Sequence, residues 1–462
     1  MFGPSLNSVS IEAPTSDAPW LAWHAHAILA CPNWNRQIRW QPMQPLYRKI
    51  ALRLVPFLIL LYLVAFLDRV NISFAALTMN RDLHIGESLF GLAAGVFFLG
   101  YFFFEVPSNL MLLRVGPRRW IMALMIAWGI VSVATAFVPG PWLYIVLRFL
   151  LGSAEAGFYP GVILYLTFWL PPSVRSSVMA MFVTAIPLSN IVGSPLSAQI
   201  LQLNHFAWLN GWQWLFVLEG SPAILLGASV FFLLPDSPEE VRWLSAEEKE
   251  TLGRELNATA PAHTGKAHSL LHAFTAQPVV YGWSLAYFCL MLGLYGLGFW
   301  IPTVLASRGI ALTHLGWASA LPYVAAIVGM VLWSRSSDRH RERRAHLTAA
   351  YLAAAVGFLI AAFAPNATLA ILGFGLAAIG ILSAMPVFWS TSTLELAGPL
   401  IAAHIAVINS IGNLGGFFGP VVMGWLRQTT HSYIAGLASI ALCLAIGAVC
   451  AFELCKPKSS GI

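Results

Sequence analysis

Six ionisable side chains lie inside stretches of the sequence that are otherwise apolar. They are Asp68, Arg69, Glu105, Arg148, Glu155 and Glu219. On insertion scales an ionised side chain at the centre of a bilayer costs about 2.5–3.5 kcal/mol, so each residue is a candidate for function. A guanidinium stays charged when water is removed and presents a fork of donors to a carboxylate. Arg69 and Arg148 are therefore predicted to bind an anion, and the alternative for each is a structural ion pair.

Carboxyl groups in the same environment are candidates for proton transfer. Burial disfavours the ionised form of a carboxyl group and a neighbouring guanidinium favours it, so Asp68 and Glu155 are able to exchange protons as their surroundings change. The alternative is that each permanently neutralises an arginine. Glu105 and Glu219 are interpreted as structural residues that organise helix packing.

The spacing of these residues groups them on helix faces. Arg148 and Glu155 are seven residues apart, which places them on one face, about 10 Å apart along a helix axis. Tyr101, Glu105 and Asn109 recur every four residues and form a polar stripe. Polar faces in an apolar bundle point inward. Tyr101 is therefore added to the predicted substrate-binding residues.

The elements that position these residues are predicted to be membrane-spanning helices. The chain has 462 residues, 58% hydrophobic and 10% charged, against about 25% charged in soluble domains. A bilayer core about 30 Å thick requires about 20 apolar residues per helix. The sequence supplies twelve such stretches: 54–75, 88–113, 118–138, 142–168, 176–202, 213–234, 279–303, 314–334, 346–364, 367–392, 400–426 and 432–453. The predicted fold is an all-α membrane protein with twelve transmembrane helices.

The longest polar segment divides the twelve spans into two groups of six. We expect an N-terminal extension without regular structure at 1–45, a six-helix half at 46–234, a cytoplasmic linker at 235–277, a second six-helix half at 278–455 and a cytoplasmic tail at 456–462. Within the linker, Ser245 and Glu248 have the spacing of a capping box, which predicts a short surface helix. Met43 precedes a basic segment and is an alternative start of the native chain.

An internal repeat relates the two halves. Arg114-Val-Gly-Pro-Arg-Arg follows the second span, and Arg339-His-Arg-Glu-Arg-Arg follows the eighth at an offset of 225 residues. Parallel repeats of this kind occur in transporters. The same offset carries Arg69 onto Leu294, and the other buried charges of the first and fourth spans likewise fall on uncharged residues. The proton and anion chemistry is therefore predicted to lie in the first six helices.

The distribution of basic residues predicts the orientation in the membrane. Of the 25 Lys and Arg residues, 20 fall on the side that holds both termini, while Arg81, Arg308 and Arg427 fall on the other side and two lie inside spans. Basic residues concentrate in cytoplasmic loops. We therefore expect a multi-pass protein of the plasma (inner) membrane with both termini in the cytoplasm.

The basic loops after the second and eighth spans are predicted to act in gating. They are expected to pair with acidic residues and helix ends at the cytoplasmic face. The residues concerned are Arg114, Arg118, Arg119, Asp338, Arg339, Arg343 and Arg344. His404 in the eleventh span is either a proton relay or a solvated residue near the helix end, and the second interpretation is preferred.

Four further motifs resemble one transporter family. They are Phe66-Leu-Asp-Arg-Val-Asn-Ile-Ser, Gly100-Tyr-Phe-Phe-Phe-Glu-Val-Pro-Ser-Asn, Gly152-Ser-Ala-Glu-Ala-Gly-Phe-Tyr-Pro and Ile408-Asn-Ser-Ile-Gly-Asn-Leu-Gly-Gly. Together with the repeated basic loops, they resemble the major facilitator superfamily over residues 46–455. Within it they resemble the anion:cation symporter branch, which includes bacterial phthalate, tartrate and sugar-acid permeases.

The resemblance implies roles for particular residues. Arg69 matches an arginine that contacts substrate, and Asp68 and Glu155 match residues that couple transport to protons. Trp389 and Asn409 match positions that line the site in related permeases, so both are predicted to bind substrate.

The predicted lining departs from that of sugar-acid permeases, which surround their ligand with hydroxyl and amide groups. Here the matching positions hold Phe66, Ile186, Pro386 and Phe388. Sites built to hydrogen-bond hydroxyl groups discriminate strongly for them. We therefore prefer an aromatic acid or unsaturated dicarboxylate as substrate, with a sugar acid as the alternative.

The predicted function is proton-coupled uptake of a small organic carboxylate by alternating access, in a protein that works as a monomer in the lipid bilayer. The alternative is a facilitative carrier or anion exchanger without proton coupling. The sequence has no nucleophile-and-base motif typical of an enzyme, and its five cysteines have no paired or metal-ligand spacing. No cofactor, metal or nucleic-acid partner is expected.

Overall fold

The computed structural model describes residues 45–171, 174, 178–179, 181–182, 184–259, 278–340, 342–396 and 401–455, without the side chains of 257–259, 338 and 401–403. The expectations for the extension before residue 45, the later part of the linker, the tail after residue 455 and the side chain of Asp338 lie outside this description. The chain divides into two compact units, Met1–Lys49 and Ile50–Ile462. The fold and site described below belong to the second unit.

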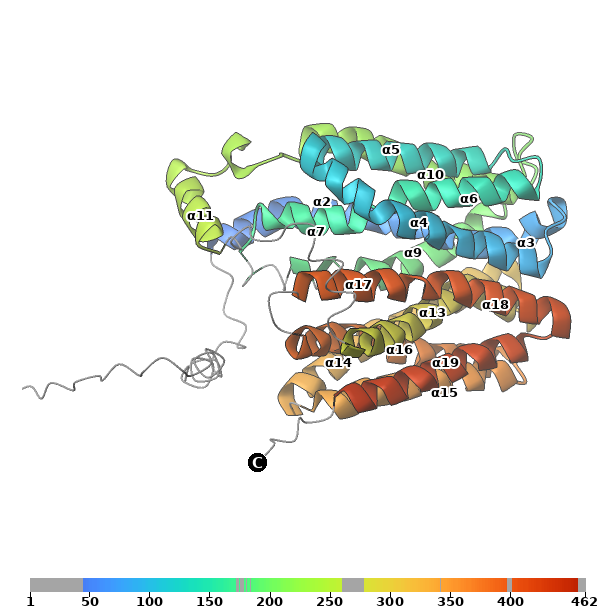
Figure 1. Ribbon diagram of the computed structural model, residues 1–462. Coiled ribbons are helices and arrows are strands. Elements are labelled where there is room, and N and C mark those ends of the chain that lie inside the picture. The colour runs from blue at the N-terminus through green and yellow to red at the C-terminus, as the bar shows by residue number, and fades with distance from the viewer. Residues whose placement is uncertain are drawn as a thin grey trace, which may run out of the picture. The chain divides into compact units, whose positions relative to one another are not determined.

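Two groups of helices make up the structure shown in Figure 1. The first comprises α2 (Pro45–Val70), α3 (Ile72–Asp82), α4 (Glu87–Val115), α5 (Pro117–Thr135), α6 (Pro141–Glu155), α7 (Phe158–Thr167), α9 (Ala185–Ile200) and α10 (Gly211–Leu233). The second comprises α13 (Pro278–Ser307), α14 (Leu312–His340), α15 (Arg343–Phe363), α16 (Ala367–Glu395), α17 (Ile401–Asn413), α18 (Gly415–Thr430) and α19 (Tyr433–Leu454). The 3₁₀ turn η2 (Pro238–Glu240) and α11 (Ala246–Thr259) follow the first group in sequence.

Ten of the described helices match their predicted spans to within four residues at each end, whereas the first extends over Pro45–Asp82 against the predicted 54–75. Within the described residues, eleven helices are long and apolar enough to cross a membrane. The 16 residues of α9 lie in the predicted fifth span, part of which is outside the described residues. Together they fit the twelve-helix fold, and the predicted fold class is confirmed.

Local sequence signals explain where several helices begin and end. Pro117 and Pro141 occupy the first positions of α5 and α6, where the missing amide hydrogen has no helical partner to lose. Gly116 ends α4 with a φ of 91°, which favours glycine. The predicted capping box is confirmed, because Glu248 N donates to Ser245 Oγ at 3.1 Å and Ser245 N donates to Glu248 Oε2 at 2.8 Å.

Three predicted spans each consist of two helical segments. The first divides at Asn71 between α2 and α3, the fourth after Glu155 between α6 and α7, and the eleventh at Leu414 between α17 and α18. The joining residues keep right-handed helical φ and ψ angles, so each pair of segments continues as one membrane-length helix. Arg69 and Glu155 therefore each lie in the last turn of the first segment of their span.

The two groups of helices approach closely at one end of the bundle. We call it the sealed end; it carries residues 83–86 and the start of α14. There Gly91 of α4 lies against the backbone of Pro420 in α18, and Gly316 of α14 lies against the backbone of Ser194 in α9. Small residues allow such close backbone contact. Toward the opposite end, α4 packs far less on α17 than it does on α18.

Candidate functional site

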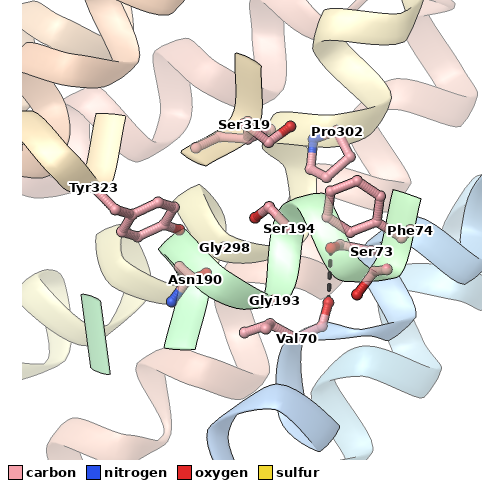
Figure 2. A pocket seen from close by; sticks show the side chains of 12 residues that line it. Val70, Ser73, Phe74, Asn190, Gly193, Ser194, Gly298, Pro302, Ser319 and Tyr323 are labelled. Carbon is pink, nitrogen blue, oxygen red and sulfur yellow. Dashed lines mark hydrogen bonds between the residues drawn. The ribbon is translucent and has the colours of Figure 1, made fainter. Parts of the chain in front are cut away.

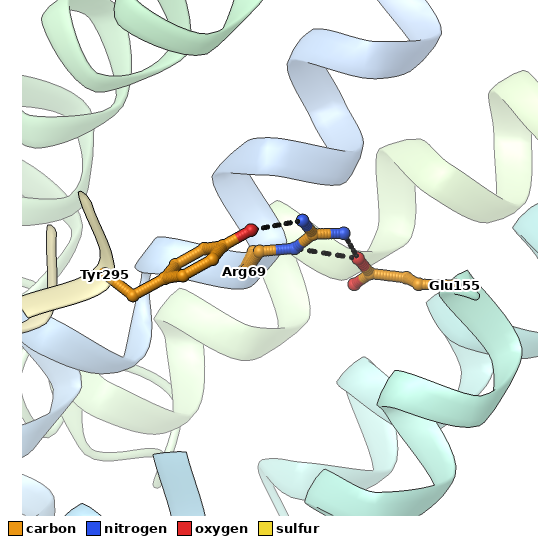
Figure 3. Close-up of polar contacts among 3 residues, drawn as sticks. All are labelled: Arg69, Glu155 and Tyr295. Atoms are coloured by element: carbon orange, nitrogen blue, oxygen red, sulfur yellow. Dashed lines mark hydrogen bonds and ion pairs between the residues drawn. The ribbon is translucent and has the colours of Figure 1, made fainter. Parts of the chain in front are cut away.

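Arg69 lies where the two groups of helices meet. Its Nη2 and Nε donate to Oε2 of Glu155 at 2.7 and 3.2 Å, and its Nη1 donates to the hydroxyl of Tyr295 at 3.2 Å (Figure 3). Glu155 ends α6 in the first group, whereas Tyr295 belongs to α13 in the second. The exposed fraction is 7% for Arg69 and 1% for Glu155. The guanidinium thus forms a buried ion pair within one group and a hydrogen bond to the other.

Aromatic rings enclose the Arg69 guanidinium. Its Cζ lies 5.1 Å from the ring centre of Phe97, 5.3 Å from that of Phe66 and 5.4 Å from that of Tyr101. Ring faces attract a cation, and a site walled by rings excludes water. Coulomb attraction is stronger where water is excluded. The predicted residue Tyr101 and the apolar lining residue Phe66 are therefore both at Arg69.

Arg148 is a second buried guanidinium beside the first. It is 1% exposed, and its Cζ lies 5.1 Å from the centre of the same Phe97 ring. None of its guanidinium nitrogens has a hydrogen-bond partner among the described residues. Leaving a buried charge without its partner typically costs about 3–5 kcal/mol. The alternative role of Arg148 was to form a structural ion pair. The described residues form no hydrogen-bonded ion pair with it.

Asp68 is the sequence neighbour of Arg69 but bonds elsewhere. Its Oδ1 accepts hydrogen bonds from Asn71 Nδ2 at 3.2 Å and from Ser132 Oγ at 2.5 Å. Adjacent helical residues point in different directions, so Asp68 faces α5 while Arg69 faces Glu155. The carboxylate that Arg69 neutralises is therefore Glu155, seven residues after Arg148 in the sequence.

The second group of helices adds neutral residues. Asn409 Nδ2 donates to Glu105 Oε1 at 3.0 Å, which links α17 to α4. The Trp389 ring packs edge-on against Tyr287 with 4.9 Å between ring centres, and Trp389 is partly exposed. The Glu105 side chain therefore contacts the opposite group rather than only packing within its own.

Comparison with known families identifies the fold. The model of the Major Facilitator Superfamily matches residues 58–420 and 283–461. The chain belongs to the major facilitator superfamily. The eleven membrane-length helices among the described residues, the contact between two helix groups at Arg69 and the predicted family resemblance all agree with that membership.

Relatives narrow the position within the superfamily. An Agrobacterium vitis protein named "Putative tartrate transporter" is 48% identical over 90% of this chain and 96% of its own length. A Pseudomonas putida protein named "Putative metabolite transport protein NicT" is 41% identical over 86% of this chain and 92% of its own length. The predicted anion:cation symporter branch is thereby confirmed, and the chain is a transporter of the superfamily rather than an enzyme.

Solved structures show the same fold. A bacterial homolog of the human lysosomal transporter Spinster, inward-facing and unoccupied, superposes with a TM-score of 0.70 at 18% identity over 89% of this chain and 97% of that chain. A D-xylose-proton symporter has a TM-score of 0.69 at 16% identity over 89% of this chain and 99% of that chain. At these identities the likeness concerns the fold alone.

The basic loop after α4 makes contacts within the first half of this superfamily fold. Arg118 N donates to Asp236 Oδ1 at 2.9 Å, and Arg118 Nε lies 3.5 Å from Asp236 Oδ2. Arg114 and Arg119 are exposed. Arg118 and Asp236 therefore connect the start of α5 with the segment that follows α10.

The corresponding loop after α14 contacts helix ends of the second half. Arg343 Nη1 donates to the carbonyl of Ser390 at 3.2 Å, and Arg344 Nε donates to the carbonyl of Phe452 at 2.8 Å. Arg339 is exposed. These contacts bind α15 to the ends of α16 and α19, in the same half.

Two residues differ from their sequence interpretation. Tyr295 was absent from the predicted site, although the 225-residue offset places it directly after Leu294, the counterpart of Arg69. His404 was preferred as a solvated residue, but it is 2% exposed, and neither ring nitrogen has a hydrogen-bond partner among the described residues. A lone polar side chain on an apolar helix does not reveal whether a neighbouring helix covers it.

Proposed function

We propose that this transporter takes up a small organic carboxylate together with protons by alternating access. The observation that carries the proposal is the Arg69 guanidinium, which is held by Glu155 in one half and by Tyr295 in the other. A substrate carboxylate can replace Glu155 at the same donors. Binding then strengthens the link between the halves, because Tyr295 and Arg69 both face the ligand.

Arg148 is the second anion ligand in this proposal. Arg69 and Arg148 each lie 5.1 Å from the centre of the Phe97 ring, and Arg148 has hydrogen-bond donors to spare among the described residues. Two guanidinium groups around one apolar ring suit a ligand with two carboxylates. We therefore favour a dicarboxylate over a monocarboxylic aromatic acid, and the tartrate transporter among the relatives supports that class.

Glu155 is the proposed coupling residue, with Asp68 as a second proton site. A proton on Glu155 removes its charge and frees Arg69 for the substrate. Moving one negative charge into a negative interior costs about 2.3 kcal/mol per 100 mV, and a dianion about twice that. Each proton that accompanies the anion cancels one such charge. Trp389, Asn409 and Tyr101 complete the proposed binding site.

The orientation and state follow from the same proposal. In this proposal the protein lies in the inner membrane and both termini are in the cytoplasm. The sealed end then faces outward. The close contacts of Gly91 and Gly316 then close the outer path, and the structure corresponds to an inward-facing state. The basic loops with Arg118 and Arg343 hold each half together at the inner end while the two halves rotate against each other. One copy of the chain is sufficient for transport in this proposal.

Uptake by the purified protein in liposomes tests the proposal. The wild type should accumulate radiolabelled tartrate against its gradient only when the outside is more acidic. Glu155→Gln should abolish accumulation and retain exchange of labelled for unlabelled tartrate, because a neutral side chain still leaves Arg69 available. Uphill uptake by Glu155→Gln would exclude Glu155 as the coupling residue. Uptake by the wild type with a collapsed proton gradient would instead favour an exchanger or facilitative carrier.

A further inference from the structure

Glu219 is a buried carboxyl group that the proposed transport cycle does not use. It lies in α10, is 3% exposed and accepts a hydrogen bond from Ser197 of α9 at 2.6 Å on Oε1. Its Oε2 has no hydrogen-bond partner among the described residues. Among the described residues, no lysine, arginine or histidine forms an ion pair with Glu219. An ionised carboxylate without a cation is expensive at membrane depth, so these surroundings favour the protonated form of Glu219.

Glu219 and Asp68 belong to one polar cluster. Asn71 and Ser132 donate to Asp68 Oδ1, and Asn71 also interacts with Glu219. Together with Ser197 these residues form what we call the carboxyl cluster. It joins α2, α5, α9 and α10 inside the first half, with Asn71 lying between α2 and α3.

Gly220 allows α5 and α10 to approach within the carboxyl cluster. A Cβ at Gly220 would lie 2.8 Å from Ser132 Oγ and 2.9 Å from its Cβ. The residue after Glu219 therefore lies directly against the serine that bonds Asp68. Close helix packing brings the two carboxyl-bearing segments together.

The helices around Glu219 carry few other charges. The charged residues of α3 are Arg81 and Asp82 at the sealed end, those of α5 are Arg118 and Arg119 at the opposite end, and α9 has none. Asp68 is thus the charged partner that Glu219 faces.

Ser197 also lines a cleft between the two halves. The cleft is bordered by Ser73, Asn190 and Ser194 of the first half and by Ser319 and Tyr323 of the second (Figure 2). Ser319 is 1% exposed, and its hydroxyl has no partner among the described residues. With several hydroxyl and amide groups around it, the cleft has room for about one water molecule. It lies toward the sealed end from Arg69, since Ser73 belongs to α3, which leads from Arg69 to residues 83–86.

We propose that Glu219 is a further proton-binding residue, which exchanges protons with water in this cleft through Ser197. This inference rests on the proposed proton coupling. When Glu219 is ionised, Ser197 passes its hydroxyl proton to Glu219 Oε1 and takes a proton from a hydronium ion in the cleft, which becomes water. Ser197 ends unchanged and one proton is transferred; the reverse sequence releases it. Ionised Glu219 and Asp68 repel each other. A proton gained by Glu219 therefore makes it easier for Asp68 to ionise, which links the cleft to the central site.

Glu219→Gln tests this relay in liposomes, with radiolabelled tartrate as the probe and an internal pH dye as a second readout. Glutamine keeps the size and accepts the Ser197 hydrogen bond but carries no exchangeable carboxyl proton. We expect proton-driven uptake to slow by about 10²-fold, the lower end of what a positioned proton-transfer group contributes. Tartrate exchange at equal pH on both sides should persist, because Arg69 and Arg148 are untouched.

Two variants of Ser197 test the same relay if Glu219→Gln does not fold. Ser197→Ala should slow proton-driven uptake, whereas Ser197→Thr should restore it by returning the hydroxyl. Ser189→Ala is the matched control, because Ser189 is buried in the same helix and donates to the carbonyl of Ile186 instead. That control should transport as the wild type does.

The outcomes separate this inference from the proposed function. If Glu155→Gln abolishes accumulation while Glu219→Gln and Ser197→Ala accumulate tartrate at the wild-type rate, the relay is wrong and proton coupling stands. If the wild type accumulates tartrate without a proton gradient, both proposals are wrong. Loss of tartrate exchange at equal pH in Glu219→Gln, with Ser197→Ala active, would make Glu219 a structural residue and overturn the relay.

Discussion

The two halves have the same architecture but different interiors. In the described residues, the buried charged side chains Asp68, Arg69, Arg148, Glu155 and Glu219 all belong to the first half. The second half contributes a tyrosine hydroxyl, an asparagine and aromatic rings to the interface. One half therefore carries the charges, and the other meets them with neutral groups.

This difference separates two tasks of an alternating-access transporter. One is to hold charged groups inside the membrane, and the other is to let the two halves move apart. A charged group is costly to move between environments, so charges are most stable in a half that keeps its own polar partners. Hydrogen bonds across the interface that have one neutral partner are cheaper to make and break than ion pairs. Tyr295 and Asn409 supply such bonds to Arg69 and Glu105. The halves can then separate without breaking the Arg69–Glu155 ion pair.

The largest expected effect comes from changing the charged half at its centre. Arg69→Lys keeps the charge but loses the fork of donors that reaches Glu155 and Tyr295 together. Truncating one partner of a buried charged pair typically costs about 2–5 kcal/mol, so we expect tartrate uptake to fall by about 30-fold or more. Initial uptake rates in liposomes measure it.

Arg254→Lys is the matched control for that change, because the side chain of Arg254 is 71% exposed on α11 and contacts neither the site nor the basic loops. It should leave uptake near the wild-type rate. Normal uptake by Arg69→Lys would mean that the positive charge alone is sufficient and that the fork of donors is not needed. Arg69 would then no longer support the contrast between the two halves.

A substitution at the sealed end should shift the balance between states. Gly91→Val places a branched side chain against the backbone of Pro420. Overpacking costs about 1–3 kcal/mol, which should favour opening at this end by about fivefold or more. In a background with the five native cysteines replaced by serine, an impermeant thiol reagent added on the side of the sealed end should label Ser319→Cys faster.

Gly375→Val is the control for the sealed-end experiment. Gly375 is a buried helical glycine of α16, and a Cβ there would have no atom within 4 Å. Its labelling rate should match that of the parent. Equal labelling of the Gly91 and Gly375 variants would show that the sealed end opens without separating α4 from α18.

A smaller effect is expected from the neutral half. Tyr295→Phe removes one long hydrogen bond to Arg69, worth about 1 kcal/mol, and should raise KM for uptake about fivefold. Tyr351→Phe removes a buried hydroxyl that bonds the Ala286 carbonyl inside the second half. It should lower thermal stability and leave KM unchanged. If both variants alter KM alike, Tyr295 has no special part in binding.

The smallest effect is expected at the half-exposed basic loop. Arg118 and Asp236 have side chains 28% and 29% exposed, with 3.5 Å between Nε and Oδ2. Solvent screens such a pair, so a double-mutant cycle of Arg118→Ala and Asp236→Ala should give a coupling energy below about 1 kcal/mol. Thermal unfolding in detergent measures it. A coupling energy well above about 1 kcal/mol would show that this pair contributes strongly to the stability of the first half.

Much of the architecture could be predicted because hydropathy and local signals act over short distances. The apolar stretches predicted helix lengths, Gly116 and Pro117 marked a turn, and the Ser245 capping box formed as expected. The 225-residue offset also indicated that the charges belong to one half. The fourth span, predicted as a single helix at 142–168, is one membrane-length helix at Pro141–Thr167.

The sequence by itself determined which residues carry charge inside the membrane, in which half they lie and to which superfamily the chain belongs. Only the tertiary structure decided their partners. Arg69 pairs with Glu155, 86 residues away, and with Tyr295, 226 residues away, rather than with its neighbour Asp68. Asp68 instead joins Glu219 in the carboxyl cluster. The reason is geometric: successive residues of a helix point apart, so packing between distant helices selects each contact.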